Sequence, residues 1–302
     1  MEDTNSIGRG KPHWLRRRLP SGPEYEEVRQ LLRRRRLHTV CQEAACPNQF
    51  ECFSNKTATF LILGSKCTRN CRFCNIEHAS SLPAPDLQEP IRVADAAVLL
   101  QLRYVVITSV TRDDLPDGGA GHFAAVIEEI RRRDQKVKIE VLIPDFRGDP
   151  RALKALLAAG PDVLNHNIET VPRIYPRVRP EADYRRSLAL LKSVADFDPH
   201  IPIKSGLMLG LGETTEEVHQ TLCDLFESGC RFLTVGQYLQ PTANHLPVER
   251  FVPPDEFDAL SERARAIGFE VAACGPFVRS SYHAREMYRC HADGSRCMQQ
   301  DT

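Results

Sequence analysis

Short apolar runs alternate with longer segments that predict helices through most of the chain. Six of these runs have the length and composition of buried strands, at 59–63, 104–108, 138–143, 162–166, 203–209 and 231–235. Helices are predicted over 93–102, 120–133, 149–159, 183–196, 214–228 and 255–267. Short apolar strands separated by helices of about ten to fifteen residues indicate βαβ units and a parallel sheet.

Capping residues mark the starts of two of these helices. Asp149 precedes Pro150, and Gly160 follows the same segment, which is the usual order of an N-cap, a first-turn proline and a helix stop. Thr214 and Glu217 have the spacing of a capping box, in which each side chain bonds the backbone amide of the other residue.

Six βα units are too few to close an eight-stranded barrel. The predicted fold class is therefore α/β, an open, partial (β/α)6 TIM-like barrel. At 302 residues the chain is long enough to bury a large core as one domain. In parallel α/β barrels the functional groups gather on the loops that follow the strands, so we expect the chemistry on those loops.

Composition narrows the possible functions. The 40 basic residues balance 40 acidic ones, so no overall field attracts nucleic acid or a membrane surface. No apolar run approaches the roughly 20 residues of a membrane span. The chain is long and its first ten residues lack the apolar core of a secretory signal, so its 11 cysteines do not indicate a disulfide scaffold. We expect a reducing compartment, in which thiolates remain available to iron. We therefore expect a soluble, single-domain enzyme of the cytoplasm.

A cysteine loop carries the strongest chemical signal. Cys67, Cys71 and Cys74 follow the first predicted strand in C-x3-C-x2-C spacing. Three thiolates on one short loop can ligate three irons of a [4Fe–4S] cluster and leave the fourth iron open to a small molecule. A structural zinc site is the weaker interpretation, because such sites usually show paired C-x2-C motifs and four ligands.

A second cysteine triplet lies upstream of the first. Cys41, Cys46 and Cys52 have C-x4-C-x5-C spacing. Taken alone, they could form a zinc site completed by His38, or they could be incidental buried cysteines. Beside the first triplet they favour a second cubane, in which one iron again lacks a cysteine ligand.

The two triplets in this order resemble the lipoyl synthase family of radical S-adenosylmethionine (radical SAM) enzymes. The resemblance extends to Arg279-Ser-Ser-Tyr282 and to His166-Asn-Ile-Glu-Thr170, which match the R-S-S-Y and H-N-x-E-T motifs of that family. It covers about 13–287 and implies the same partial barrel. It also implies that Ser280 is the fourth ligand of the auxiliary cluster, the one held by the upstream triplet.

With this resemblance we expect four parts of the chain. They are a disordered N-terminus, an N-terminal extension with the auxiliary-cluster cysteines, the radical SAM partial barrel, and a C-terminal extension with the Arg-Ser-Ser-Tyr motif. Their expected bounds are 1–12, 13–56, 57–268 and 269–302.

The resemblance also implies a reaction. Two sulfur atoms are inserted, at C6 and C8 of an octanoyl chain attached to a lysine of a lipoyl carrier domain. Insertion at an unactivated C–H bond needs a radical, which cofactors rather than side chains supply. The implied cofactors are S-adenosylmethionine and two [4Fe–4S] clusters. The cluster of the Cys67 loop would cleave S-adenosylmethionine to a 5′-deoxyadenosyl radical, and the auxiliary cluster would be the sacrificial source of sulfur.

The implied partners follow from this reaction. They are octanoylated lipoyl carrier domains (2-oxoacid dehydrogenase E2 subunits and the glycine cleavage H protein), an electron donor such as flavodoxin or ferredoxin, and an iron–sulfur carrier. We expect no nucleic acid and no membrane among them. Two other functions stay open on the residues alone: a different radical SAM sulfur-inserting enzyme, and a zinc-binding, nucleic-acid-binding protein.

Four further residues are predicted to bind S-adenosylmethionine: Asn167, Glu169, Arg179 and Lys204. Asn167 and Glu169 have hydrogen-bonding groups for the cofactor, although Glu169 could equally cap the following turn. Arg179 offers a planar fork for a carboxylate, whereas a surface salt bridge is the default for it and for Arg173 and Arg177. Lys204 precedes a Gly-rich run that either approaches a ligand or forms only a strand-to-helix turn.

Positive charge is concentrated near the N-terminus. Arginines occupy 16–18 and 33–36. This pattern favours a solvated helix face, and docking of an acidic carrier domain is the alternative.

Overall fold

The computed structural model describes residues 11–15, 23–44, 46–54 and 59–294. At its centre is an eight-stranded sheet in the order β1-β2-β5-β6-β7-β8-β9-β10. Neighbouring strands are parallel, except that β1 runs antiparallel to β2. The strands of this sheet are β1 (His38–Thr39), β2 (Thr59–Ile62), β5 (Tyr104–Ser109), β6 (Lys138–Leu142), β7 (Val163–Asn165), β8 (Ile203–Leu209), β9 (Phe232–Gln237) and β10 (Val271–Gly275). A separate parallel pair joins β3 (Lys66–Cys67) and β4 (Glu77–His78).

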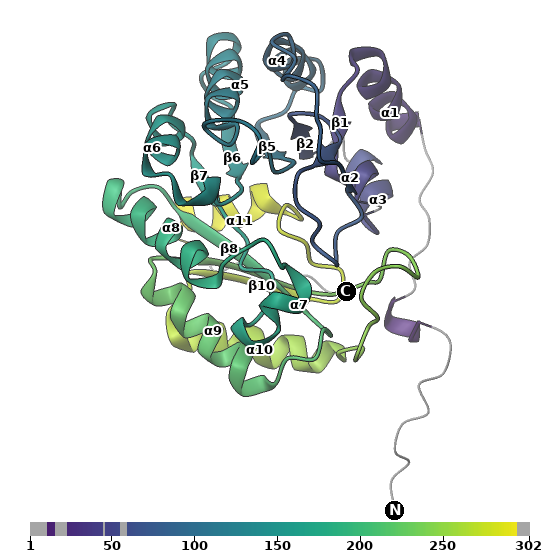
Figure 1. Cartoon of the computed structure of the whole chain (residues 1–302), viewed down its shortest axis with the longest axis vertical. Helices are drawn as coiled ribbons and strands as arrows, with labels where there is room; N and C mark the ends of the chain where they lie inside the picture. Colours follow the sequence, from purple (N-terminus) through teal and green to yellow (C-terminus); the bar gives the residue numbers. More distant parts are fainter. Residues whose placement is uncertain (1–10, 16–22, 45, 55–58, 295–302) are drawn as a thin grey trace, which may run out of the picture.

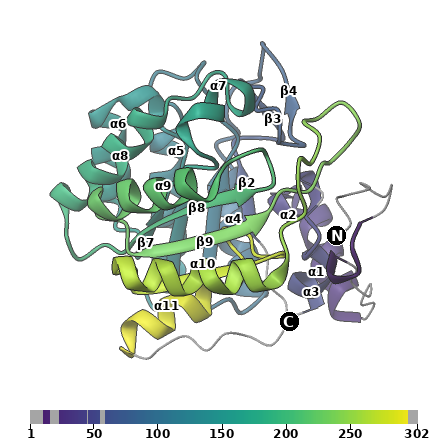
Figure 2. The ribbon, with the colours of Figure 1, turned by 90° about the horizontal axis from the view of Figure 1, so that it is seen from below.

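Most of the helices lie in an arc outside the curved sheet (Figure 1; seen from below in Figure 2). The helices are α1 (Pro23–Arg35), α2 (Val40–Glu43), α3 (Gln49–Ser54), α4 (Glu89–Leu99), α5 (Ala120–Arg133), α6 (Pro150–Ala158), α7 (Tyr175–Val178), α8 (Tyr184–Phe197), α9 (Thr215–Glu227), α10 (Pro254–Ile267) and α11 (Ala284–Ala292). Three single turns of 3-10 helix are η1 (His13–Leu15), η2 (Phe146–Gly148) and η3 (Pro172–Ile174). Within the described ranges, no helix has both the length and the apolar character needed to cross a bilayer.

The six predicted βα units are confirmed. The predicted strands are β2, β5, β6, β7, β8 and β9, and the predicted helices are α4, α5, α6, α8, α9 and α10. The side chain of Asp149 accepts a hydrogen bond from the amide of Arg151, which makes it the N-cap of α6. Both hydrogen bonds of the capping box between Thr214 and Glu217 are present at the start of α9.

The sequence pattern missed a seventh unit and a short helix. Strand β10 lies parallel to β9 and extends the sheet, and α11 follows it. Its residues, Val-Ala-Ala-Cys-Gly, are too small to form a conspicuous apolar run. The segment 171–180, for which no helix was predicted, contains η3 and α7, because Pro172 and Pro176 occupy first-turn positions where a missing amide costs no hydrogen bond.

Helix α11 closes the amino end of the barrel. Its residues Ala284 and Tyr288 pack against Tyr104, the first residue of β5. Met287 packs against Phe232 and Val271, the first residues of β9 and β10. The carboxyl ends of the strands are therefore the accessible end of the barrel, as expected for a parallel α/β barrel.

The two outer strands of the sheet, β1 and β10, leave one side of the barrel to be covered by other segments. The chain that follows β1 contacts the chain that follows β10. The side-chain amide of Asn48 donates to the carbonyl of Phe277 at 2.8 Å, and the hydroxyl of Tyr282 donates to Glu51 Oε1 at 2.8 Å. These contacts bring the upstream cysteine segment and the Arg-Ser-Ser-Tyr motif side by side.

Candidate active site

The Cys67 loop lies at the carboxyl end of β2. Cys67 ends the short strand β3, and the amide of Cys74 donates to the carbonyl of Cys71 at 3.0 Å. Two further amides point at the sulfur of Cys67: that of Thr111 at 3.3 Å and that of Arg69 at 3.4 Å. Backbone N–H groups aimed at a sulfur stabilise the thiolate that iron requires.

The three sulfurs of this loop share one environment. Burial raises the pKa of Cys71, and the charge of Arg179 partly offsets that rise. Burial also raises the pKa of Cys74, to about 12, and the charges of Cys71 and Cys67 add to the shift. Such thiols give up their protons when a metal binds, so binding of iron to this loop would be coupled to proton release.

Asn167, Glu169 and Arg179 lie together at the carboxyl end of β7. The amide of Asn167 donates to Glu169 Oε1 at 3.0 Å. Arg179 Nη1 donates to the carbonyl of Asn167 at 3.1 Å. Burial raises the pKa of Glu169, whereas the charge of Arg179 and the hydrogen bond from Asn167 act to lower it. Three of the four predicted cofactor-binding residues are thus brought into contact.

Glu169 does not cap the turn that follows it. Its side chain bonds Asn167, while its backbone amide and carbonyl bond Gly206 and Met208 of β8. Its φ of 68° is left-handed, so the backbone is held in a conformation that favours glycine in order to aim this carboxylate.

A buried chain of hydrogen bonds supports Arg179. Arg179 Nη1 donates to the hydroxyl of Tyr175 at 2.9 Å, and that hydroxyl lies 3.4 Å from Ser187 Oγ. Ser187 Oγ lies 2.9 Å from Nε2 of His166, whose Nδ1 lies 2.8 Å from the carbonyl of Ile143. Burial lowers the pKa of His166 to about 4, so the ring is neutral: its Nδ1–H donates a hydrogen bond to the carbonyl of Ile143, and its Nε2 accepts one from the hydroxyl of Ser187.

The two other arginines of this segment form surface ion pairs, as expected for exposed arginines. Arg173 forms an exposed ion pair with Glu217, with Nε 2.6 Å from Oε1. Arg177 pairs with Glu249, with Nη2 3.2 Å from Oε1. Arg179, by contrast, lies close enough to Cys71 for its charge to act on that thiol.

Lys204 has a different environment from the other predicted cofactor-binding residues. Its side chain is 0% exposed, and its Nζ lies 3.0 Å from Oε1 of Glu140. The same carboxylate accepts from the hydroxyl of Tyr104 at 2.6 Å and from the amide of Asn165 at 3.0 Å. The structure therefore gives Lys204 an ion pair inside the barrel, toward the end that α11 closes.

The Gly-rich run that follows Lys204 forms a strand-to-helix turn. The amides of Gly210 and Leu211 donate to the two carboxylate oxygens of Glu213, at 2.6 and 2.9 Å. These amides are therefore already paired within the chain.

The upstream triplet lies on α2, on α3 and on the turn between them. Cys41 lies in α2 and Cys52 in α3, and the amide of Cys46 donates to the carbonyl of Cys41 at 3.1 Å. A hydrogen bond between the thiols lowers the pKa of Cys41 and raises that of Cys52. The amide of Asn75 donates to the carbonyl of Glu43 at 3.0 Å, so the residue after Cys74 touches the segment between Cys41 and Cys46.

Ser280 lies at the mouth of the barrel. Its hydroxyl donates to Asn167 Oδ1 at 2.8 Å, and Tyr282 N bonds the carbonyl of Arg279, so the motif forms a turn. A methyl group placed on Gly206 would meet Thr234 Oγ1 at 2.5 Å and Ser280 Oγ at 3.3 Å. Glycine at 206 therefore provides the space in which these side chains meet.

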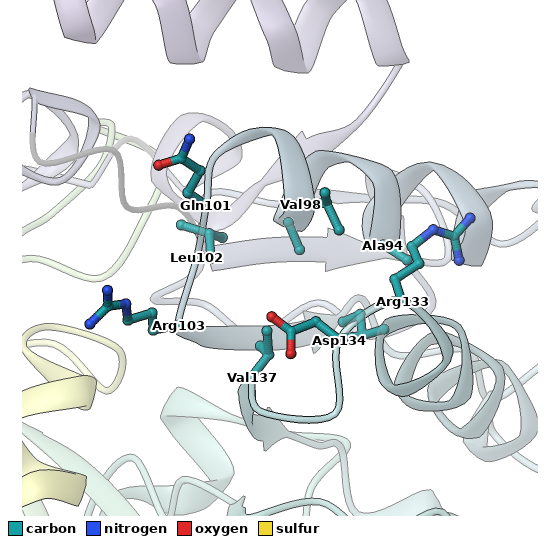
Figure 3. A pocket seen from close by; sticks show the side chains of 10 residues that line it. Ala94, Val98, Gln101, Leu102, Arg103, Arg133, Asp134 and Val137 are labelled. Atoms are coloured by element: carbon teal, nitrogen blue, oxygen red, sulfur yellow. The ribbon is translucent and has the colours of Figure 1, made fainter.

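A cavity of about 340 Å³ lies elsewhere, between α4 and α5 (Figure 3). Arg103 and Val137, which line it, precede β5 and β6, so the cavity belongs to the amino end of the barrel. It contains none of the predicted site residues. We therefore assign the chemistry to the cysteine end.

The residues present fit an iron–sulfur cluster and an anionic cofactor group. Each triplet supplies three thiol sulfurs, and Arg179 Nε is buried without a hydrogen-bond partner beside Cys71. Across the part of the chain that the structure describes, no three His, Cys, Asp or Glu side chains converge as they would on a single metal ion. The thiolates of a cubane each ligate a different iron, so they do not need to converge in that way.

The sequence pattern missed the groups that fix the cysteine loop. Arg69 forms ion pairs with Asp113 and Asp145, with its Nε 2.7 Å from Asp113 Oδ2 and its Nη2 2.6 Å from Asp145 Oδ1. Burial would raise the pKa of Asp145, but the hydrogen bond and charge of Arg69 outweigh burial and lower it to about 2. An arginine inside the cysteine motif was the available signal, although its partners lie 44 and 76 residues away.

Comparison with known proteins agrees with this arrangement. The family model of the radical SAM superfamily matches residues 61–225. Among solved structures, HydG, a maturase of the [FeFe]-hydrogenase, has a TM-score of 0.55 at 15% identity, over 78% of this chain and 64% of that one. Streptococcus suis SuiB bound to its precursor peptide has a TM-score of 0.53 at 13% identity, over 71% of this chain and 48% of that one. At these identities the likeness concerns the fold alone. The fold, the cysteine loop and the family model together define a radical SAM enzyme.

More specific matches cover nearly the whole chain. The model of the N-terminal domain of lipoyl synthase matches residues 4–46. Lipoyl synthase of Desulfotalea psychrophila is 61% identical over 280 residues, which are 93% of each chain. That of Methylococcus capsulatus is 58% identical over 275 residues, 91% of this chain and 85% of the other. The chain belongs to the lipoyl synthase family. Membership excludes both alternatives, the different sulfur-inserting enzyme and the zinc-binding nucleic-acid-binding protein.

Proposed function

We propose that the Cys67 loop holds the [4Fe–4S] cluster that binds S-adenosylmethionine, and that the upstream triplet holds a second cluster with Ser280 as its fourth ligand. The observation that carries this proposal is the contact between the two cysteine segments, in which Asn75 Nδ2 donates to the carbonyl of Glu43 at 3.0 Å. Sulfur transfer requires both sites to reach one substrate chain, and this contact is what two adjacent sites would produce.

The cofactors supply the chemistry that side chains cannot. When bound, the loop cluster supplies the electron that cleaves S-adenosylmethionine to a hydrogen-abstracting 5′-deoxyadenosyl radical, and the auxiliary cluster supplies sulfur. The residues of the chain bind and orient these groups. Arg179 offers its free Nε to a carboxylate, and Asn167 and Glu169 offer hydrogen-bonding groups at the same strand end. Lys204 acts indirectly, by pairing with Glu140 inside the barrel.

The substrate of this family is an octanoylated lipoyl carrier. We further propose 2-oxoacid dehydrogenase E2 subunits and the glycine cleavage H protein as carriers, with flavodoxin or ferredoxin as electron donor and an iron–sulfur carrier that rebuilds the auxiliary cluster in the cytoplasm. Within the described ranges the cysteines of both triplets form no disulfide, which suits a reducing compartment.

Anaerobic reconstitution tests the proposal. The chain should bind roughly eight irons, as expected for two cubanes. With S-adenosylmethionine, a reductant and an octanoyl-lysine peptide, mass spectrometry should detect the gain of two sulfur atoms. About four irons, or cleavage of S-adenosylmethionine without any sulfur-containing product from the intact chain, would contradict the two-cluster assignment.

A further inference from the structure

We infer that Arg69 is a positioning residue that sets both the geometry and the reduction potential of the cluster held by the Cys67 loop. The inference rests on the proposed function, because it needs a cluster on that loop. Arg69 lies between Cys67 and Cys71 in sequence but points away from solvent, with only 5% of its surface exposed.

The guanidinium of Arg69 joins the cysteine loop to two other loops. Nε and Nη2 donate to the two oxygens of Asp113, at 2.7 and 2.9 Å, and Nη2 also donates to Asp145 at 2.6 Å. Asp113 follows β5 and Asp145 follows β6. One side chain therefore fixes the cysteine loop against the carboxyl ends of two neighbouring strands, and the bidentate geometry fixes its orientation as well as its distance.

A chain of hydrogen bonds connects Asp113, the partner of Arg69, to the sulfur of Cys67. The amide of Asp113 donates to Thr68 Oγ1 at 3.1 Å, and Thr68 Oγ1 donates to the carbonyl of Thr111 at 3.0 Å. The amide of Thr111 then donates to Cys67 Sγ at 3.3 Å. Because Arg69 holds Asp113, it also holds the Thr111 amide against that sulfur.

Both effects of Arg69 act on the potential in the same direction. Hydrogen bonds to the sulfur ligands are among the factors that set the reduction potential of iron–sulfur clusters, and a donor that stabilises added negative charge favours reduction. The charge of Arg69 opposes the carboxylates of Asp113 and Asp145, which are 24% and 1% exposed and so are weakly screened. Arg186 reaches the outer oxygen of Asp145 at 3.2 Å, but its side chain is 37% exposed. Without Arg69, the loop would carry an excess of buried negative charge and the cluster would be harder to reduce.

The test compares four variants of the full, reconstituted enzyme. Arg69→Gln removes the charge and the fork, Arg69→Lys keeps the charge, and Asp113→Asn removes one negative charge but retains an acceptor. Arg72→Gln is the matched control, because Arg72 lies on the same loop with an exposed side chain. The readouts are iron content and the midpoint potential of the paramagnetic signal that changes when S-adenosylmethionine is added.

Arg69→Gln should disfavour reduction by on the order of tenfold, which is about 59 mV for one electron. Asp113→Asn should shift the midpoint potential in the opposite direction. The potential of Arg69→Lys should stay closer to that of the unsubstituted enzyme, and the potential of Arg72→Gln should equal that of the unsubstituted enzyme. General destabilisation cannot produce shifts of opposite sign. If Arg69→Gln fails to retain its cluster, the upward shift of Asp113→Asn decides the question.

Unchanged potentials in Arg69→Gln and Asp113→Asn would overturn the inference while leaving the cluster assignment intact. If instead the unsubstituted enzyme and a Cys67→Ala variant have the same iron content and the same signal, the proposed function itself fails.

Discussion

The hydroxyl of Ser280 donates a hydrogen bond to the side-chain oxygen of Asn167, 2.8 Å away and 113 residues earlier in the chain. Asn167 in turn bonds Glu169, and the turn that carries Ser280 contacts the upstream cysteine segment through Tyr282 and Glu51. The C-terminal motif therefore reaches both the strand end that we propose binds the cofactor and the segment that we propose holds the auxiliary cluster. A residue in this place can contact both the proposed S-adenosylmethionine site and the proposed auxiliary-cluster site.

Ser280→Ala should stop formation of the lipoyl product while cleavage of S-adenosylmethionine continues. Loss of one hydrogen bond costs only about 1 kcal/mol, so the fold should survive and the effect should be chemical. Ser281→Ala is the control and should be milder. Product and 5′-deoxyadenosine are quantified in the same assay, and full turnover by Ser280→Ala would remove this serine from the auxiliary site.

The two cysteine triplets should differ in what they abolish. Cys67→Ala, Cys71→Ala or Cys74→Ala should end reductive cleavage of S-adenosylmethionine, because the open iron would be lost. Cys41→Ala, Cys46→Ala or Cys52→Ala should leave 5′-deoxyadenosine formation measurable and end sulfur insertion. The reverse pattern in a single-turnover assay would mean that the two assignments are interchanged.

Lys204→Met should lower the free energy of unfolding by about 3–5 kcal/mol, because it leaves the carboxylate of Glu140 buried without its cation. Lys154→Met, at an exposed position of α6, should have little effect. Denaturation of the cluster-free chain measures both. Binding of S-adenosylmethionine by the folded fraction of Lys204→Met should be unchanged, and a selective loss of that binding would return Lys204 to the cofactor site.

His166 should make stability depend on pH in the mildly acidic range. Its pKa in the folded chain is about 4, below the value of about 6.5 in an unfolded chain, so between these values the unfolded state binds more protons. Stability should therefore fall as the pH drops from 7 to 5, by on the order of 2 kcal/mol from this group. His166→Gln should flatten that part of the profile. His200→Gln, at an exposed position, should not, and equal profiles for all three proteins would contradict the buried neutral ring.

Carrier docking can be tested on two arginines of the N-terminal region. Arg35 pairs with Asp95 and Arg34 contacts Gln30, whereas Arg33 and Arg36 are exposed. Arginines 16–18 lie outside the described residues. If Arg33 and Arg36 attract an acidic carrier domain, Arg33→Glu with Arg36→Glu should raise KM for that domain in a salt-dependent way. KM for an octanoyl-lysine peptide should change much less, and equal changes for both substrates would favour a simple solvated face.

The amino-acid sequence by itself determined the elements that depend on near neighbours. Helix α5 has its predicted bounds, and the caps at Asp149 and Thr214 are formed as their spacing indicates. The cysteine triplets were equally visible, since the cysteines of each triplet lie within 12 residues of one another. These signals come from residues that are a turn or a loop apart, so the interactions behind them can be recognised in a short stretch of sequence.

Only the tertiary structure decided which distant groups meet. The sequence could not indicate that Lys204 would pair with Glu140, because that pairing depends on how strands 64 residues apart are aligned. Strand β10 is too small and too weakly apolar to be recognised alone, yet its pairing with β9 brings Ser280 to Asn167. The partners of Arg69 come from two loops that are adjacent only because parallel strands end at the same edge of the sheet. Burial then stabilises these pairs, because a buried charge is costly unless an opposite charge and hydrogen bonds inside the fold compensate the loss of hydration.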